Sequence, residues 1–161
     1  MKIIGIDGAT KNSGLAVMED GKLIDCKLIS LSGDVNVRLP KMMMAICAYI
    51  NKYKPDKIIM EKSILTTNVD GVQKLANLAG AVMFFAYSKG IEFEHQYPTE
   101  WRAKIGLSQS KKIKRDVLKQ EAIAVVKQEY GLDVGDDVSE AILMARSGFD
   151  LPKIIISKND I

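Results

Sequence analysis

The chain has 161 residues, 47% of them hydrophobic and 27% charged, and carries a formal net charge of +3. This length and apolar content fit one globular domain over residues 1–161 with a core of its own. The opening MKIIGIDGA reaches an acid before a signal-peptide core develops, and the longest apolar-rich run, LAGAVMFFAY, is too short to span a bilayer. We therefore expect a soluble, cytoplasmic protein that does not engage a membrane.

The cysteine and histidine residues of this chain are poor candidates for metal binding or catalysis. Cys26 and Cys47 match no metal-binding or redox spacing, which favours free thiols in a reducing compartment. His95 is the single histidine, so a zinc site or a histidine-based triad has no partners for it. Acidic residues are left as the main candidates for catalysis.

The predicted elements begin with three strands, over residues 2–7, 14–19 and 22–29, joined by glycine-containing turns as an antiparallel meander. Helical spacing predicts a helix over about 37–53, and a short apolar run predicts a fourth strand ending near residue 61. A helix over about 72–86 and a strand over 91–97 follow. Three further helices are predicted over about 98–105, 112–129 and 137–147. This order indicates an α/β fold, a five-stranded mixed sheet flanked by helices.

Four acids stand at the ends of these elements. Asp7 follows the apolar run IIGI and Glu61 follows KIIM, so each ends a strand. A right-handed crossover sets the fourth strand parallel to a neighbour, and α/β sheets bind ligands at the carboxyl ends of their strands. Asp137 and Glu140 lie at the start of the last helix, with Asp136 beside them. If the fourth strand lies beside the first, Asp7 and Glu61 are neighbours.

Each of these acids also has a purely structural interpretation. Asp137 as N-cap with Glu140 three residues later is a capping box. Asp7 before a glycine is ordinary turn chemistry, and Glu61 can pair with a surface cation such as Lys62.

A metal site explains the acids together. Carboxylates that converge on one edge repel each other unless a cation neutralises them. Ligands that are all oxygen favour Mg²⁺, with Mn²⁺ as a substitute. Two such ions about 4 Å apart activate a water and stabilise the leaving oxygen of a phosphodiester.

A basic segment over residues 101–120, WRAKIGLSQSKKIKRDVLKQ, follows the fifth predicted strand. We expect its cations to contact the phosphates of DNA, with a solvated basic face as the alternative. Trp101 is interpreted as a packing residue rather than a base-stacking one. The cations predicted to contact DNA are Arg102, Lys104, Lys111, Lys112, Lys114 and Arg115.

The ordered motifs GIDGATKNSGLAV, IIMEKS and DDVSEAI resemble the RuvC-like Holliday-junction resolvases of the ribonuclease H-like superfamily, as does the order of strands and helices. The resemblance covers most of the chain and implies a ribonuclease H-like fold. It also implies that Asp7, Glu61, Asp137 and Glu140 bind two Mg²⁺ ions per active site, although Glu140 stands where many relatives have Asp.

The resemblance further implies a homodimeric endonuclease that cuts branched DNA and leaves 5′-phosphate ends. Four-way junctions are the expected substrate, with forks and Y-structures as further candidates, in the cytoplasm of a bacterium or a phage-infected host. Small residues in the second predicted helix would let a partner helix approach closely, although ordinary intramolecular packing explains them equally well. These residues are Ala76, Ala79, Gly80 and Ala81.

Three other functions are weighed against this one. The first motif also resembles the phosphate loop of actin, Hsp70 and sugar kinases, but those proteins need two such domains, and the chain has no P-loop sequence. We therefore expect no nucleotide cofactor. Cleavage of RNA in RNA–DNA hybrids uses the same metal chemistry and stays open. A catalytically silent nucleic-acid-binding domain is the third alternative, and the presence of all four acids argues against it.

Overall fold

The computed structural model of the chain describes residues 1–63, 67–109 and 113–155. Its strands are β1 (Lys2–Asp7), β2 (Asn12–Glu19), β3 (Lys22–Ser30), β4 (Lys57–Glu61) and β5 (Glu92–Gln96). Its helices are α1 (Val35–Tyr53), α2 (Val69–Ser88), α3 (Pro98–Ile105), α4 (Arg115–Tyr130) and α5 (Asp136–Ser147). Along these described ranges, no helix is both long and apolar enough to cross a bilayer.

The five strands form one mixed sheet in the order β3-β2-β1-β4-β5. β1, β2 and β3 pair as an antiparallel meander, whereas β4 runs parallel to β1 and β5 runs parallel to β4. The predicted sheet is therefore confirmed, including the place of the fourth strand beside the first. Ile6 is paired with Met60, so the residues that follow them, Asp7 and Glu61, lie at the same edge of the sheet.

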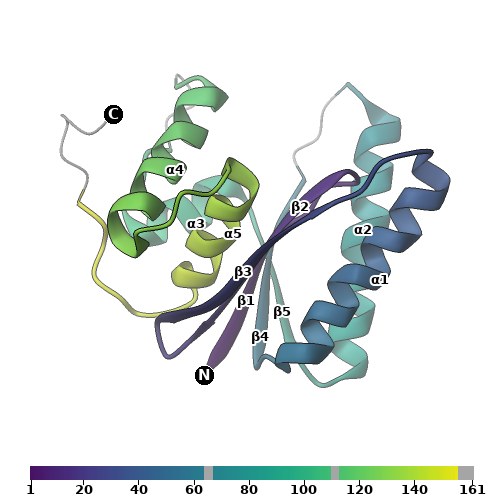
Figure 1. The fold of residues 1–161 in the computed structure, drawn as a ribbon, viewed down its shortest axis with the longest axis horizontal. Coiled ribbons are helices and arrows are strands. Elements are labelled where there is room, and N and C mark those ends of the chain that lie inside the picture. Colours follow the sequence, from purple (N-terminus) through teal and green to yellow (C-terminus); the bar gives the residue numbers. More distant parts are fainter. Residues whose placement is uncertain (64–66, 110–112, 156–161) are drawn as a thin grey trace.

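Helices cover both faces of this sheet. Figure 1 shows α1 and α2 on one side and α3, α4 and α5 on the other. Because successive side chains of a strand point to opposite faces, Ile4 and Ile58 join the core beneath α1 and α2, while Ile3 and Ile59 join the core beneath α5. Burial on both faces explains why the central strands are almost wholly apolar.

Four helix starts differ from their predictions, since α2 begins three residues earlier and α4 three residues later than predicted, and the starts of α5 and α1 also move. α5 begins at Asp136 with Gly135 as its N-cap, so the predicted capping box with Asp137 as N-cap is wrong. Asp136 is the first residue of the helix and forms an ion pair with Lys119 of α4. Asp137 therefore lies inside the first turn. α1 begins at Val35, where the Asp34 side chain accepts a hydrogen bond from a backbone N–H. The predicted start near residue 37 would put Pro40 in the first turn, but the observed start places it deeper inside the helix.

Candidate active site

Asp7 and Glu61 come from adjacent parallel strands. Asp7 is the last residue of β1 and Glu61 is the last residue of β4. Each strand is buried up to the residue before its acid, so both carboxylates stand where the core ends. Two of the four predicted acids therefore belong to the strands themselves, and the sheet fixes their positions directly.

Asp137 and Glu140 come from α5, which crosses the sheet at β1 and β2. Asp7 is paired with Gly14 of β2, and the backbone of Asp137 packs directly on Gly14. The start of α5 consequently lies next to the end of β1. Residues 137 and 140 are three apart and share a helix face, so both acids are directed to this edge.

The electrostatics of Asp7 show that the four acids act on one another. Burial raises the pKa of Asp7 well above its usual value, and the negative charges of Glu61, Glu140 and Asp137 raise it further. Burial and then the charge of Glu61 raise the pKa of Glu140 to about 7. The fold thus gathers the four predicted acids into one region where their simultaneous ionisation is unfavourable.

Two cations of α4 oppose this effect. Burial raises the pKa of Asp137, whereas the charges of Lys119 and Arg115 lower it. The same two cations lower the pKa of Glu61 and of Glu140 against the effect of burial. Lys119, which the sequence analysis did not single out, is therefore part of the site environment, and its partner there is Asp136.

The ligand atoms of this region suit a divalent metal ion, but the side chains as they stand are not arranged around one. Four partly buried carboxylates offer only oxygen, the ligand type that Mg²⁺ and Mn²⁺ prefer. Within residues 1–63, 67–109 and 113–155, no three acidic, histidine or cysteine side chains are arranged so that they hold an ion. Mutual repulsion separates uncompensated carboxylates, so we expect small side-chain rotations to accompany metal binding.

The predicted DNA contacts other than Arg102 separate into three groups. Lys114 and Arg115 are exposed at the start of α4, where α-helices favour anions. Lys104 is exposed as well, but it forms an ion pair with Glu94 at 3.2 Å. Lys111 and Lys112 lie outside the described residues.

Arg102 is not a surface cation, so its predicted contact with DNA does not fit its position. The side chain is only 2% exposed and pairs with the buried Glu121 of α4. Its neighbour Trp101 is completely buried and donates a hydrogen bond from Nε1 to Glu61 Oε2 at 3.1 Å. The sequence predicted only a packing role for Trp101, although a buried indole N–H needs an acceptor and this need was a signal for a place in the site.

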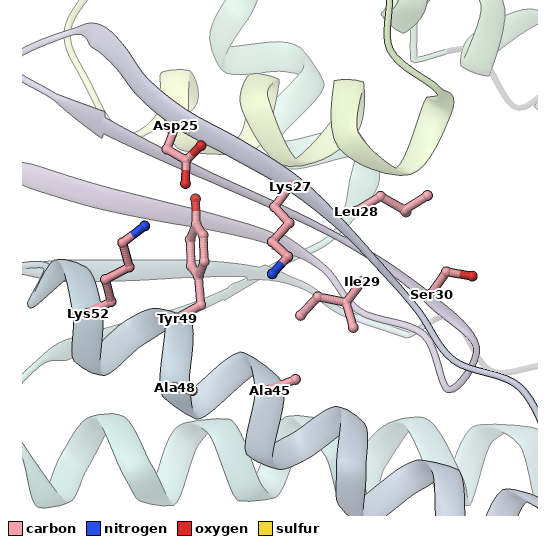
Figure 2. A pocket seen from close by; sticks show the side chains of 9 residues that line it. All are labelled: Asp25, Lys27, Leu28, Ile29, Ser30, Ala45, Ala48, Tyr49 and Lys52. Atoms are coloured by element: carbon pink, nitrogen blue, oxygen red, sulfur yellow. The ribbon is translucent and has the colours of Figure 1, made fainter.

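Two cavities lie along β3, on opposite faces of the sheet. One of about 570 Å³ lies between β3 and α1, and Figure 2 shows Tyr49 pointing across it toward Asp25. None of the four acids lines it. The other, of about 410 Å³, is lined by Leu28 of β3 and by Asp136 and Asp137 of α5, and therefore adjoins the acidic region.

Comparison with known proteins decides the family. The family model described as crossover junction endodeoxyribonuclease RuvC matches residues 3–144. The chain belongs to the RuvC family. Among curated RuvC proteins it is 27% identical to that of Campylobacter hominis over 153 residues, covering 91% of this chain and 97% of the relative. It is 26% identical to that of Aliarcobacter butzleri, covering 91% and 99%.

Solved structures support the same RuvC fold. Thermus thermophilus RuvC in complex with a Holliday junction substrate superposes with a TM-score of 0.72 at 16% identity, covering 91% of this chain and 92% of that one. Fowlpox virus resolvase, in complex with Holliday junction DNA, gives a TM-score of 0.64 at 16% identity, covering 92% and 96%. The predicted ribonuclease H-like fold and the prediction of a crossover junction endonuclease are confirmed.

Proposed function

We propose that this RuvC-family chain, acting over residues 1–161 as one nuclease domain, resolves four-way DNA junctions by metal-dependent hydrolysis that leaves 5′-phosphate ends. The observation that carries this proposal is the meeting of Asp7, Glu61, Asp137 and Glu140 at the carboxyl edge of β1 and β4, where burial and mutual charge raise the pKa of Asp7. Branched DNA in the bacterial or phage-infected cytoplasm is the proposed substrate.

In this mechanism the four acids would hold two Mg²⁺ or Mn²⁺ ions. Such a pair, when bound, supplies an activated water and stabilises the leaving oxygen of the phosphodiester. Only ionised carboxylates would hold the ions, so the raised pKa values of Asp7 and Glu140 would make metal binding depend on pH. Because α5 packs on the sheet, the four carboxylates lie at the border of the core.

The start of α4 is the proposed contact for the DNA backbone. Lys114 and Arg115 are exposed there, and the charge of Arg115 lowers the pKa of Glu61 against the effect of burial, which places this cation within electrostatic range of the acids. A phosphate held by these cations would lie beside the site of cleavage. Lys111 and Lys112 remain proposed DNA contacts of the same basic segment.

We also propose that the protein works as a homodimer through the outer face of α2. Phe84 is 75% exposed and Tyr87 is 86% exposed, with Met83 beside them and open space at Gly80. Ala79 faces the core instead, so it does not belong to this surface. Two copies related by a two-fold axis suit a substrate with two symmetric strands to cut.

The decisive experiment compares labelled substrates under three metal conditions. A four-way junction, a Y-branch, a linear duplex and an RNA–DNA hybrid are incubated with Mg²⁺, Mn²⁺ or EDTA, with Asp7→Asn as the matched variant. We expect cutting of the branched DNA with either metal, no cutting in EDTA, and none by the variant. Cutting of the hybrid alone would assign a ribonuclease role, and absence of any cutting would favour a silent binding domain.

A further inference from the structure

Trp101 and Arg102 are consecutive residues of α3, and each directs its polar group to one carboxylate of the active site. Trp101 Nε1 donates to Glu61 Oε2 at 3.1 Å, and Arg102 Nη1 lies 3.9 Å from Glu140 Oε1. We propose that these two side chains are positioning residues, which hold Glu61 and Glu140 ready for divalent metal. This inference rests on the proposed function and deepens it.

Trp101 is fixed by its packing, so its single donor has a defined direction. The side chain is completely buried in the core beneath α5, together with Ile105 and Ile142. An indole has one N–H and no acceptor, and a buried one requires a partner. Glu61 is that partner. A carboxylate oxygen has two lone pairs, so accepting this hydrogen bond does not prevent Glu61 from binding an ion.

Arg102 is fixed by three other partners before it reaches Glu140. Its Nε donates to the carbonyl of Ser108 at 2.8 Å, and its Nη2 donates to the carbonyl of Leu118 at 3.2 Å and to the carboxylate of Glu121. Glu121 in turn accepts the backbone N–H of Ser108 at 3.2 Å. The guanidinium is therefore held from two sides, and Nη1 is the group that faces the acidic region.

Outer partners of this kind orient metal ligands and set their basicity. The bond from Trp101 restrains the rotation of Glu61, and the charge of Arg102 lies beside the carboxyl of Glu140. Because the side chains as they stand do not form an ion site, metal binding requires small rotations, and the cost of these rotations is part of metal affinity. Partners on Glu61 and Glu140 limit the range of conformations that these two ligands must search, which reduces that cost.

The first test uses the unmodified protein. The chain contains one tryptophan, so its indole N–H gives a single, unambiguous resonance in a ¹⁵N-labelled sample. We expect Mg²⁺ to shift this resonance with the same midpoint that calorimetry gives for metal binding, and we expect the shift to be lost in Glu61→Gln. A resonance unmoved at saturating Mg²⁺ would overturn the role of Trp101.

The second test uses variants that separate positioning from stability. Trp101→Phe keeps an aromatic ring without the N–H, and Arg102→Lys keeps the charge without the planar fork. We expect either change to weaken Mn²⁺ affinity about 10- to 100-fold, measured without DNA, and to raise the Mg²⁺ concentration needed for half-maximal cutting. Junction binding in EDTA should stay the same.

Glu121→Gln is the matched control for Arg102. It removes the buried ion pair but keeps an oxygen that accepts from Arg102 Nη2, and the carbonyls of Ser108 and Leu118 still hold the guanidinium beside Glu140. We therefore expect a lower melting temperature with nearly unchanged Mn²⁺ affinity. Equal loss of affinity in Glu121→Gln and Arg102→Lys would overturn a specific role for Arg102. If the wild-type protein bound no metal and Asp7→Asn cut as well as wild type, the proposed function itself would fail; normal metal-dependent cutting with unaffected variants would overturn only this inference.

Discussion

The backbone carbonyl of Asp137 lies so close above Gly14 that a Cβ atom on Gly14 would stand 1.9 Å from its oxygen. Gly5 has the same relationship with the carbonyl of Ala141, at 2.0 Å. The two glycines lie on adjacent strands: Gly5 of β1 is paired with Ala16, and Gly14 of β2 is paired with Asp7. Together they let α5 approach the sheet closely enough to bring its acids to Asp7.

Substitution of Gly14 by alanine tests this close packing. Because the obstructing atom is backbone, the helix itself must move, and we expect Gly14→Ala to lower the free energy of unfolding by at least about 2 kcal/mol. Cutting should fall more than junction binding, since the displaced helix carries two of the acids. Urea unfolding and cleavage assays measure both effects. Gly135→Ala, at the N-cap of the same helix with open space around it, should cost less than about 1 kcal/mol.

The raised pKa of Glu140 predicts how stability depends on pH without metal. Burial raises this pKa from 4.5 to about 7, so between these values the folded state binds more protons than the unfolded state. The contribution of Glu140 to stability is therefore complete below pH 4.5 and is lost as pH rises through 7, a loss of as much as about 3 kcal/mol. Thermal melts in EDTA from pH 5 to pH 8 measure this fall.

Glu140→Gln is the control for that pH dependence. The variant cannot ionise at this position, so its melting temperature should change less over the same range. Saturating Mg²⁺ should oppose the fall in the wild-type protein, because bound metal favours ionised carboxylates. An equal fall in the variant and in wild type would assign the pH dependence to other groups.

Lys114 provides a test of the proposed DNA surface. Lys114→Gln should weaken junction binding and reduce the slope of log affinity against log salt by about 0.9 for one lost phosphate contact. Binding titrations between low and moderate salt give this slope. Lys127→Gln, near the other end of α4, is also exposed and should leave the slope unchanged. Equal slopes for Lys114→Gln and wild type would show that Lys114 makes no phosphate contact and belongs to a solvated basic face.

Phe84 tests the proposed dimer. Phe84→Glu places a charge on the outer face of α2, and we expect light scattering to give the mass of one 17.8 kDa chain rather than two. Met44→Glu on α1 is the matched control, because Met44 is 72% exposed on another helix. Wild-type protein that stays monomeric both with and without junction DNA would contradict the dimer.

The sequence was sufficient for the sheet and for the region of the acids. Continuous apolar runs marked the buried strands, and the handedness of the crossover placed the strand ending at Glu61 beside the strand ending at Asp7. The start of α5 was predicted one residue late. Asp136 and Asp137 both suit a helix start, and only the three-dimensional contact of Asp136 with Lys119 distinguishes them.

Long-range partners explain what the sequence did not predict. Arg102 lies in a basic segment and therefore suggested a surface cation, but its partner Glu121 is 19 residues away. Trp101 suggested packing alone, because Glu61 is 40 residues away. A glycine within a strand, such as Gly14, indicates that another backbone segment packs closely on the strand. Which segment does so depends on the whole fold.

The four acids are spread over β1, β4 and α5, with the last of them at residue 140. During synthesis, a chain that has emerged only as far as α4 contains Asp7 and Glu61 but neither of the other two carboxylates, and it lacks the helix that covers one face of the sheet. The proposed metal site is therefore complete only after residue 140 has been made and α5 has folded onto the sheet, so a nascent chain that ends before α5 is expected to be inactive.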